Sequence, residues 1–138
     1  MRHFIILLLA LSSLSFVTTK SEAPFIGTWK GEDRGEVAYI TFDHEGYAIL
    51  RIGGEVLGGK DFVYKEKKAE LKYKVIPNTK PIQLDLIIST NEPVKENKML
   101  CIAEFMSDDT MKFASNFGLN SRPTEFNIKN SIVLLREK

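Results

Sequence analysis

The sequence predicts an all-β domain, an antiparallel up-and-down meander that closes into a barrel of about eight strands. Short segments alternate polar and apolar side chains with a period of two, and turn residues separate them at close intervals. No segment shows an apolar stripe with helical spacing over three turns. A sandwich would show the same pattern. Closure is favoured because a closed barrel has no free edge strands that invite aggregation.

The first 23 residues have the composition of a secretory signal peptide. A short positive start, Met1–His3, precedes an apolar run of 14 residues, Phe4–Val17, that only serines interrupt. This run is too short to cross a membrane, which takes roughly 20 residues. We expect cleavage after Ala23, and no lipid anchor because no cysteine lies near that position. The sequence therefore predicts a secreted or periplasmic protein.

The remaining chain, residues 24–138, is expected to form one domain. Removing 23 residues from 138 leaves 115, enough to form a hydrophobic core without disulfides or bound metals. The only cysteine, Cys101, cannot form an internal disulfide. Its apolar surroundings, Met99–Ala103, predict a small buried hydrophobe. An exported domain without disulfides fits a bacterial envelope better than an animal extracellular space.

The first half of the domain contains five expected strands. In chain order they cover residues 26–31, 36–43, 47–52, 61–65 and 70–76. The second and third form the clearest hairpin, because Asp43–Gly46 has the composition of a tight turn and apolar residues alternate on both sides. The two glycine pairs at 53–54 and 58–59 predict a loop or sharp bend over residues 53–60.

The second half contains four more expected strands, at residues 82–88, 99–106, 110–114 and 132–136. The first of these alternates strictly, with Ile82, Leu84, Leu86 and Ile88 on one face. Residues 91–97 read as a polar connection, because they carry Pro93 and few apolar side chains. A long loop over residues 115–126 leads to the last strand. The first and last strands are expected to pair.

The two ends of the domain resemble the calycins, which are the lipocalins and fatty-acid-binding proteins. Gly27-Thr28-Trp29 in the first strand and Arg136 in the last are similar to the Gly-x-Trp and C-terminal arginine pair of those barrels. The resemblance implies that Arg136 packs across Trp29 at the closed end. A guanidinium over an indole face gains a cation–π contact and still donates hydrogen bonds to loop carbonyls.

A second resemblance covers roughly residues 26–136. Lys80–Leu86, Asp109–Ala114 and Arg122–Phe126 follow one another as in a family of small, uncharacterised bacterial lipocalin-like domains. That family has no known function, so the resemblance implies a lipocalin-like fold and adds no chemistry.

No catalytic or metal-binding pattern is present in the sequence. Metal sites usually gather three or four ligands, whereas residues 24–138 contain one histidine, His44, and one cysteine. The acidic pairs Glu32-Asp33 and Asp108-Asp109 lie in turns, where burial would not raise a carboxyl pKa for acid catalysis. The glycine pairs lack the lysine and helix of a phosphate loop. We expect no enzyme activity, no metal and no cofactor.

Charge does not indicate a polyanionic partner. Removing Arg2, Lys20 and Glu22 from the 19 basic and 18 acidic residues leaves 17 of each. A net charge near zero argues against nucleic acid and gives no reason to expect docking on acidic membranes. The basic cluster at residues 65–74 is expected to be a solvated hairpin face, because Glu66 and Glu70 dilute it.

The candidate ligand contacts are the large apolar residues expected inside the barrel and one arginine. They are Phe42, Leu50, Tyr73, Leu86, Phe105, Met111, Phe113 and Arg122. The apolar members suit either a pocket lining or a packed core, and the short chain slightly favours a solid core or a small cavity. Arg122 either pairs with a carboxylate in a loop that closes one barrel end or anchors an acidic ligand at the entrance.

The leading functional expectation is an exported, non-enzymatic domain that binds a small hydrophobic or amphipathic ligand. The alternative is a monomeric protein-interaction or inhibitor module with a solid core, which would contact an envelope protein through the loops at 53–60 and 115–126. In either case, the expected closing elements are Gly27, Trp29 and Arg136.

Overall fold

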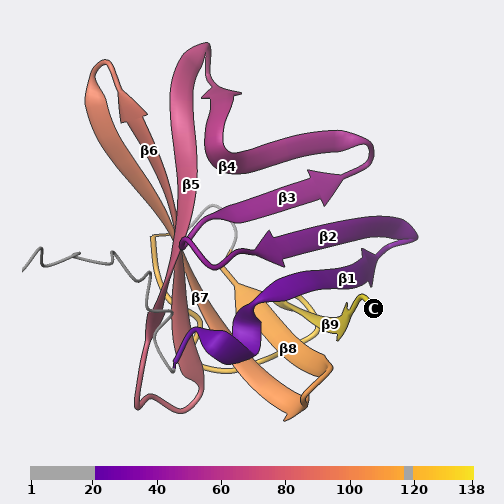
Figure 1. Ribbon diagram of the computed structural model, residues 1–138. Coiled ribbons are helices and arrows are strands. Elements are labelled where there is room, and N and C mark those ends of the chain that lie inside the picture. The colour runs from indigo at the N-terminus through magenta and orange to yellow at the C-terminus, as the bar shows by residue number, and fades with distance from the viewer. Residues whose placement is uncertain (1–20, 117–119) are drawn as a thin grey trace, which may run out of the picture.

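A computed structural model describes residues 21–116 and 120–138 of the chain. Within them, one 3-10 turn precedes nine antiparallel strands that close into a single barrel in sequence order (Figure 1). The elements are η1 Ala23–Phe25, β1 Gly27–Asp33, β2 Glu36–Phe42, β3 Ala48–Ile52, β4 Glu55–Tyr64, β5 Lys67–Ile76, β6 Ile82–Asn91, β7 Val94–Ser107, β8 Thr110–Ser115 and β9 Ser131–Arg136. The predicted all-β meander and its closure are confirmed, with nine strands in place of about eight. Most of the predicted signal segment, residues 1–20, lies outside the described residues, as do residues 117–119 of the long loop.

Of the two alternatives expected at residues 53–60, the loop is wrong, because residues 55–60 belong to β4, and the sharp bend is found within that strand at Gly58 and Gly59. Gly58 and Gly59 have φ angles of +114° and +82°, and they form a corner inside the strand instead of ending it. Before the corner β4 pairs with β3, and after it β4 pairs with β5, with a register shift between Gly59 and Phe62. Figure 1 shows β4 changing direction sharply between these two neighbours.

The predicted polar connection at residues 91–97 is also mostly strand. β6 and β7 pair continuously from Ile82↔Ala103 to Asn91↔Val94, so only residues 92–93 form the turn. This end of the hairpin projects beyond the core (Figure 1), and residues 91–98 are exposed. Alternation of apolar residues reports a buried face. A strand end whose two faces are both exposed to solvent shows no alternation of apolar residues.

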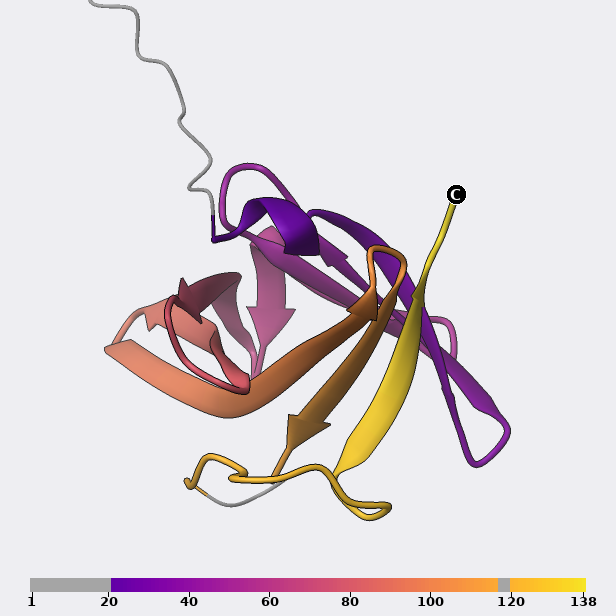
Figure 2. The same cartoon turned by 90° about the horizontal axis from the view of Figure 1, so that it is seen from below.

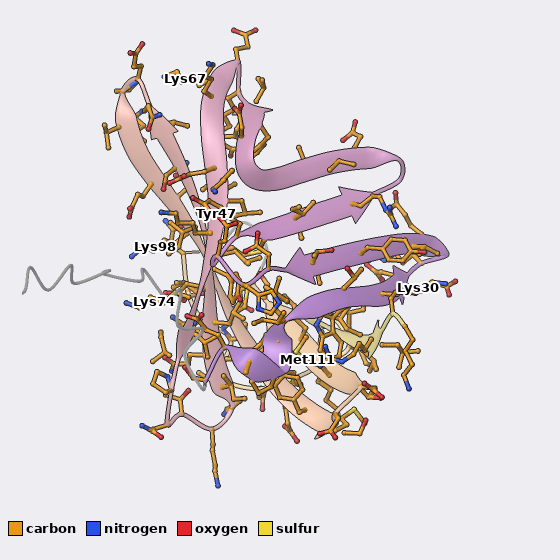
Figure 3. The ribbon with its side chains drawn as sticks, viewed as in Figure 1. Lys30, Tyr47, Lys67, Lys74, Lys98 and Met111 are labelled. Atoms are coloured by element: carbon orange, nitrogen blue, oxygen red, sulfur yellow. The ribbon has the colours of Figure 1, made fainter. Side chains whose placement is uncertain are left out.

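Several of the largest fully buried side chains lie around η1, at one end of the barrel. Phe25 packs edge-on against Phe42 and Phe105, with ring centroids 5.9 and 4.8 Å away. The indole Nε1 of Trp29 donates a 2.8 Å hydrogen bond to the Phe25 carbonyl, and both residues are fully buried. Figure 3 labels Met111, which is also fully buried, beside η1. These contacts seal this end of the barrel.

Arg136 lies outside Trp29 and ties the chain ends together. Its guanidinium carbon is 4.2 Å from the centroid of the Trp29 ring. The same guanidinium donates to the carbonyls of Ile26 (2.6 Å) and Pro24 (2.8 Å), and its Nε lies 3.1 Å from Asp109 Oδ1. One side chain therefore links β9, the β7–β8 turn and the segment before β1.

Gly27 makes room for this arginine. Its φ of +130° is a conformation that side-chain-bearing residues rarely adopt. A Cβ at this position would lie 2.9 Å from Arg136 Nη1. The glycine before Thr28-Trp29 is thus required by both backbone geometry and the approach of the guanidinium.

Candidate functional site

The barrel is least tightly closed where its first and last strands meet. β1 pairs with β2 along its whole length, but it pairs with β9 only at Trp29↔Arg136 and Lys30↔Leu135. Beyond Lys30 the two strands diverge, as Figure 2 shows for β1 and the yellow β9. We call this diverging region, residues 31–34 and 128–134, the seam.

A pocket of about 320 Å³ occupies the seam. Its walls come from the β1–β2 turn (Asp33 and Arg34), from β8 (Phe113 and Ser115), and from residues 128–132 at the start of β9. Ligand sites usually measure about 300–1,000 Å³, so this seam pocket suits a small molecule.

Apolar side chains from β8 and β9 line the inner part of the seam pocket. Phe113 and Ile132 are register partners, and both pack against the core. A Cβ on Gly31 would lie only 2.6 Å from Ile132 Cδ1 and 2.7 Å from Leu134 Cδ2. Because Gly31 has no side chain, Ile132 and Leu134 can pack closely against β1 beside the pocket.

Ser115 is the polar residue at the inner end of the pocket. It is 2% exposed, and the Cys101 thiol, a weak hydrogen-bond partner, is the one group of the described residues that interacts with its hydroxyl. Side chains two residues apart in a strand share a face, so Ser115 points to the same side as Phe113. A buried hydroxyl without a full partner is uncommon in native proteins and needs an explanation.

The neighbour of Ser115 across the β7–β8 pair is Cys101. Burial raises the pKa of this thiol to about 12, against smaller opposing effects of Arg122 and the Ser115 hydroxyl. The thiol is therefore protonated at neutral pH, where sulfur is only a weak hydrogen-bond partner. The Cys101 thiol donates at 3.6 Å to the Met99 carbonyl. The predicted burial of Cys101 is confirmed.

The outer rim of the pocket is a turn held by two asparagines. Asn127 Oδ1 accepts from the backbone N–H groups of Lys129 (2.9 Å) and Asn130 (3.0 Å), and Asn130 Oδ1 accepts from Asn127 N–H (2.8 Å). Ser131 donates its backbone N–H to the Asn127 carbonyl. This network fixes the turn and leaves Ile128 99% exposed at the rim.

The opposite rim is the two-residue turn of the β1–β2 hairpin. Arg34 and Gly35 both have positive φ, +53° and +81°, as a type I′ turn requires. Arg34, from this turn, and Lys129, from the turn before β9, both line the pocket, and neither forms an ion pair within the described ranges. Asp33 supplies a carboxylate at the same rim.

The structure divides the predicted ligand contacts between the core and three hollows. Phe113 lines the seam pocket. Leu50 lines a hollow of about 390 Å³ on β2–β4, and Phe105 lines an open groove of about 640 Å³ beside Ile82 and Phe126. The four others, Phe42, Tyr73, Leu86 and Met111, are buried in the core. Tyr73 also donates its hydroxyl to the Asp43 carbonyl at 2.8 Å.

Arg122 is engaged within the protein. Its Nη2 lies 2.7 Å from Asp85 Oδ1, and its Nη1 donates to the Cys101 carbonyl at 2.9 Å and more weakly to the Leu84 carbonyl. Asp85 is itself buried. Of the two roles considered for Arg122, this geometry is that of a loop-closing contact, which fastens the segment after β8 to β6 and β7.

Replacing Arg122 by glutamine should lower the free energy of unfolding by about 2 kcal/mol, because Asp85 would keep its charge without a partner. Urea unfolding of R122Q, D85N and the double variant measures the coupling between the two side chains. Additive effects, with a coupling below about 0.3 kcal/mol, would contradict this role.

Sequence reasoning missed most of the seam pocket. Ser115 gave one usable signal, since it follows Met111 and Phe113 in the inward phase of a strand and breaks an apolar series. Arg34 and residues 127–131 gave no such signal, because the sequence of a turn does not show whether the turn lines a pocket.

Residues 21–116 and 120–138 contain no group of three or more His, Cys, Asp or Glu side chains placed to hold a metal ion. In the same ranges, no helix has the length and apolar character to cross a membrane.

Comparisons of the chain with protein-family models, with curated proteins and with solved structures found no match.

Proposed function

We propose that the protein is an exported, non-enzymatic, lipocalin-like domain that binds a small amphipathic molecule in the seam pocket. The observation that supports this most is that the seam pocket combines apolar walls with a few polar and charged groups. Apolar walls from Phe113 and Ile132 meet the buried Ser115 hydroxyl inside and charged side chains at the rim. Pockets that bind small molecules are typically apolar with a few placed polar groups.

The core contacts favour the seam over the barrel axis as the binding place. Phe42 and Tyr73 stack edge-on with ring centroids 4.8 Å apart, and Phe25 and Trp29 both contact Phe105. These aromatic rings occupy the interior at the closed end, so a ligand there would have to displace packed side chains. At the seam, the divergence of β1 and β9 leaves space that needs no such displacement.

Export and the lipocalin likeness complete the proposal. Export rests on the composition of residues 1–23. The likeness to calycins rests on the closed meander together with the packing of Arg136 over Trp29.

Titration with N-phenyl-1-naphthylamine, a neutral apolar fluorophore, tests the proposal. We expect saturable fluorescence enhancement and energy transfer from Trp29, the only tryptophan. I128D should weaken binding about threefold, because it places a charge at the apolar rim. V94D is the matched control, since Val94 is 83% exposed on the distant β6–β7 hairpin.

Absence of saturable binding, or equal loss in I128D and V94D, would contradict a ligand site at the seam. I128D should not unfold the protein, because Ile128 is almost fully exposed.

A second candidate function is the interaction module, which one observation favours. Ile128 is held on a hydrogen-bonded turn close to Phe126 and Val133, with which it lines a surface hollow. The loop expected at 53–60 no longer supports this alternative, since most of it is strand β4. Capture of an envelope protein by the wild type, lost in I128D, would favour this candidate.

A further inference from the structure

We infer that the seam pocket selects a medium-chain carboxylate bearing a second oxygen, with the acid group at the rim and the other oxygen on Ser115. This inference rests on the proposed function and specifies the ligand class of the same site. It comes from three features of the seam pocket: two cations at the rim, apolar walls, and a buried hydroxyl at the inner end.

The rim favours an anion over a cation. Arg34 and Lys129 face the pocket from the β1–β2 turn and from the turn before β9, and they outnumber the single carboxylate, Asp33. Neither cation is held by an ion pair in the part of the chain that the structure describes. Both are therefore available to a carboxylate, which a guanidinium can bind through two parallel hydrogen bonds.

The inner end favours an uncharged oxygen over a carboxylate. Phe113 and Ile132 surround the approach to Ser115, and a desolvated carboxylate there would have one hydroxyl as its partner. A hydroxyl or carbonyl oxygen loses much less on desolvation. Ser115 can donate to either and accept from a hydroxyl, so such a ligand would give this hydroxyl a stronger partner than the Cys101 thiol.

Ligand pairs of equal chain length test the two ends separately. Calorimetric titrations would compare ω-hydroxy acids of about six to ten carbons with the unsubstituted acids and with the alcohols. We expect the acids to bind about fivefold more tightly than the alcohols. The ω-hydroxy acids should bind about tenfold more tightly than the acids.

Three variants assign these preferences to residues. R34N should reduce the preference for acids, and asparagine tolerates the positive φ of this turn position. K30Q is its matched control, because Lys30 lies on the outer face of β1 and does not line the pocket (Figure 3). S115A should abolish the gain from the ω-hydroxyl.

S115A has a second readout that separates binding from folding. Removing a buried hydroxyl whose partner among the described residues is the weakly bonding Cys101 thiol should leave the urea midpoint of the ligand-free protein unchanged or higher. A lower midpoint would show that Ser115 has a structural partner and would overturn its assigned role.

The outcomes distinguish this inference from the proposed function. If N-phenyl-1-naphthylamine binds but acids and alcohols bind equally, or the ω-hydroxyl gain persists in S115A, the inference is overturned and the ligand site stands. If neither the fluorophore nor any member of the series binds, both are overturned.

Discussion

Replacing Trp29 by alanine is expected to lower the free energy of unfolding by about 3–5 kcal/mol, the usual loss for a large aromatic in a core. Trp29 is fully buried, contacts Phe105 and donates to the Phe25 carbonyl. Its removal would also take away the ring against which Arg136 packs. The measurement is urea unfolding followed by far-UV circular dichroism, because the variant lacks tryptophan fluorescence.

Two further variants serve as controls for W29A. W29F keeps an aromatic ring but loses the Nε1 donor and part of the buried ring volume, so its loss should be smaller than that of W29A. L135A lies on the outer face of β9, where the side chain is half exposed, and it should cost well under 1 kcal/mol. A loss below about 1 kcal/mol in W29A would contradict the description of this end of the barrel as sealed.

Replacing Gly58 by alanine should destabilise the barrel by about 3 kcal/mol or more, because strain and collision act together. A Cβ there would overlap the Ala48 carbonyl oxygen and lie 3.1 Å from Ile49 Cα, so backbone atoms of β3 would have to move. The φ of +114° adds strain for any side chain. Urea unfolding of G58A measures the effect.

Gly54 provides the matched control for Gly58. It also has a positive φ, +86°, but nothing lies within 4 Å of an added Cβ. G54A should therefore show conformational strain alone, about 1 kcal/mol. Equal losses in G58A and G54A would mean that the β4 corner does not depend on close contact with β3.

The strand order was predictable from local patterns, whereas the packing of Arg136 over Trp29 was expected from the resemblance to the calycins. The hairpin of β2 and β3 has matched alternation around a turn-forming segment, and the alternating apolar series from Ile82 to Ile88 marks β6 as strongly. Two rules link sequence and structure directly here. A strand with one buried face alternates with period two, and a glycine pair allows backbone angles that other residues avoid.

These two rules left alternatives open at the glycine pair within β4 and gave a wrong prediction at the outer ends of β6 and β7. Gly58 and Gly59 could mark a loop or a corner within a strand, and only the pairing of β4 with both β3 and β5 separates these cases. The outer ends of β6 and β7 extend beyond the core, so their polar residues resembled a connection.

The seam pocket was the least predictable feature. It depends on the number of pairs that β1 and β9 form, and register between the first and last strands is set by the packing of the whole barrel. Nothing in the residues near Gly31 shows that pairing stops at Lys30. The two possible roles of Arg122 likewise depended on Asp85 being within reach, and the two lie 37 residues apart in the chain.

The central claim is that one end of the barrel is sealed by Phe25, Trp29 and Arg136, while ligand binds at the seam. Amide chemical shifts recorded during titration with an ω-hydroxy acid test it directly. We predict changes confined to residues 31–34, 113–115 and 127–132, with the Trp29 indole N–H resonance unmoved. A shifted indole resonance together with unchanged seam amides would contradict the claim.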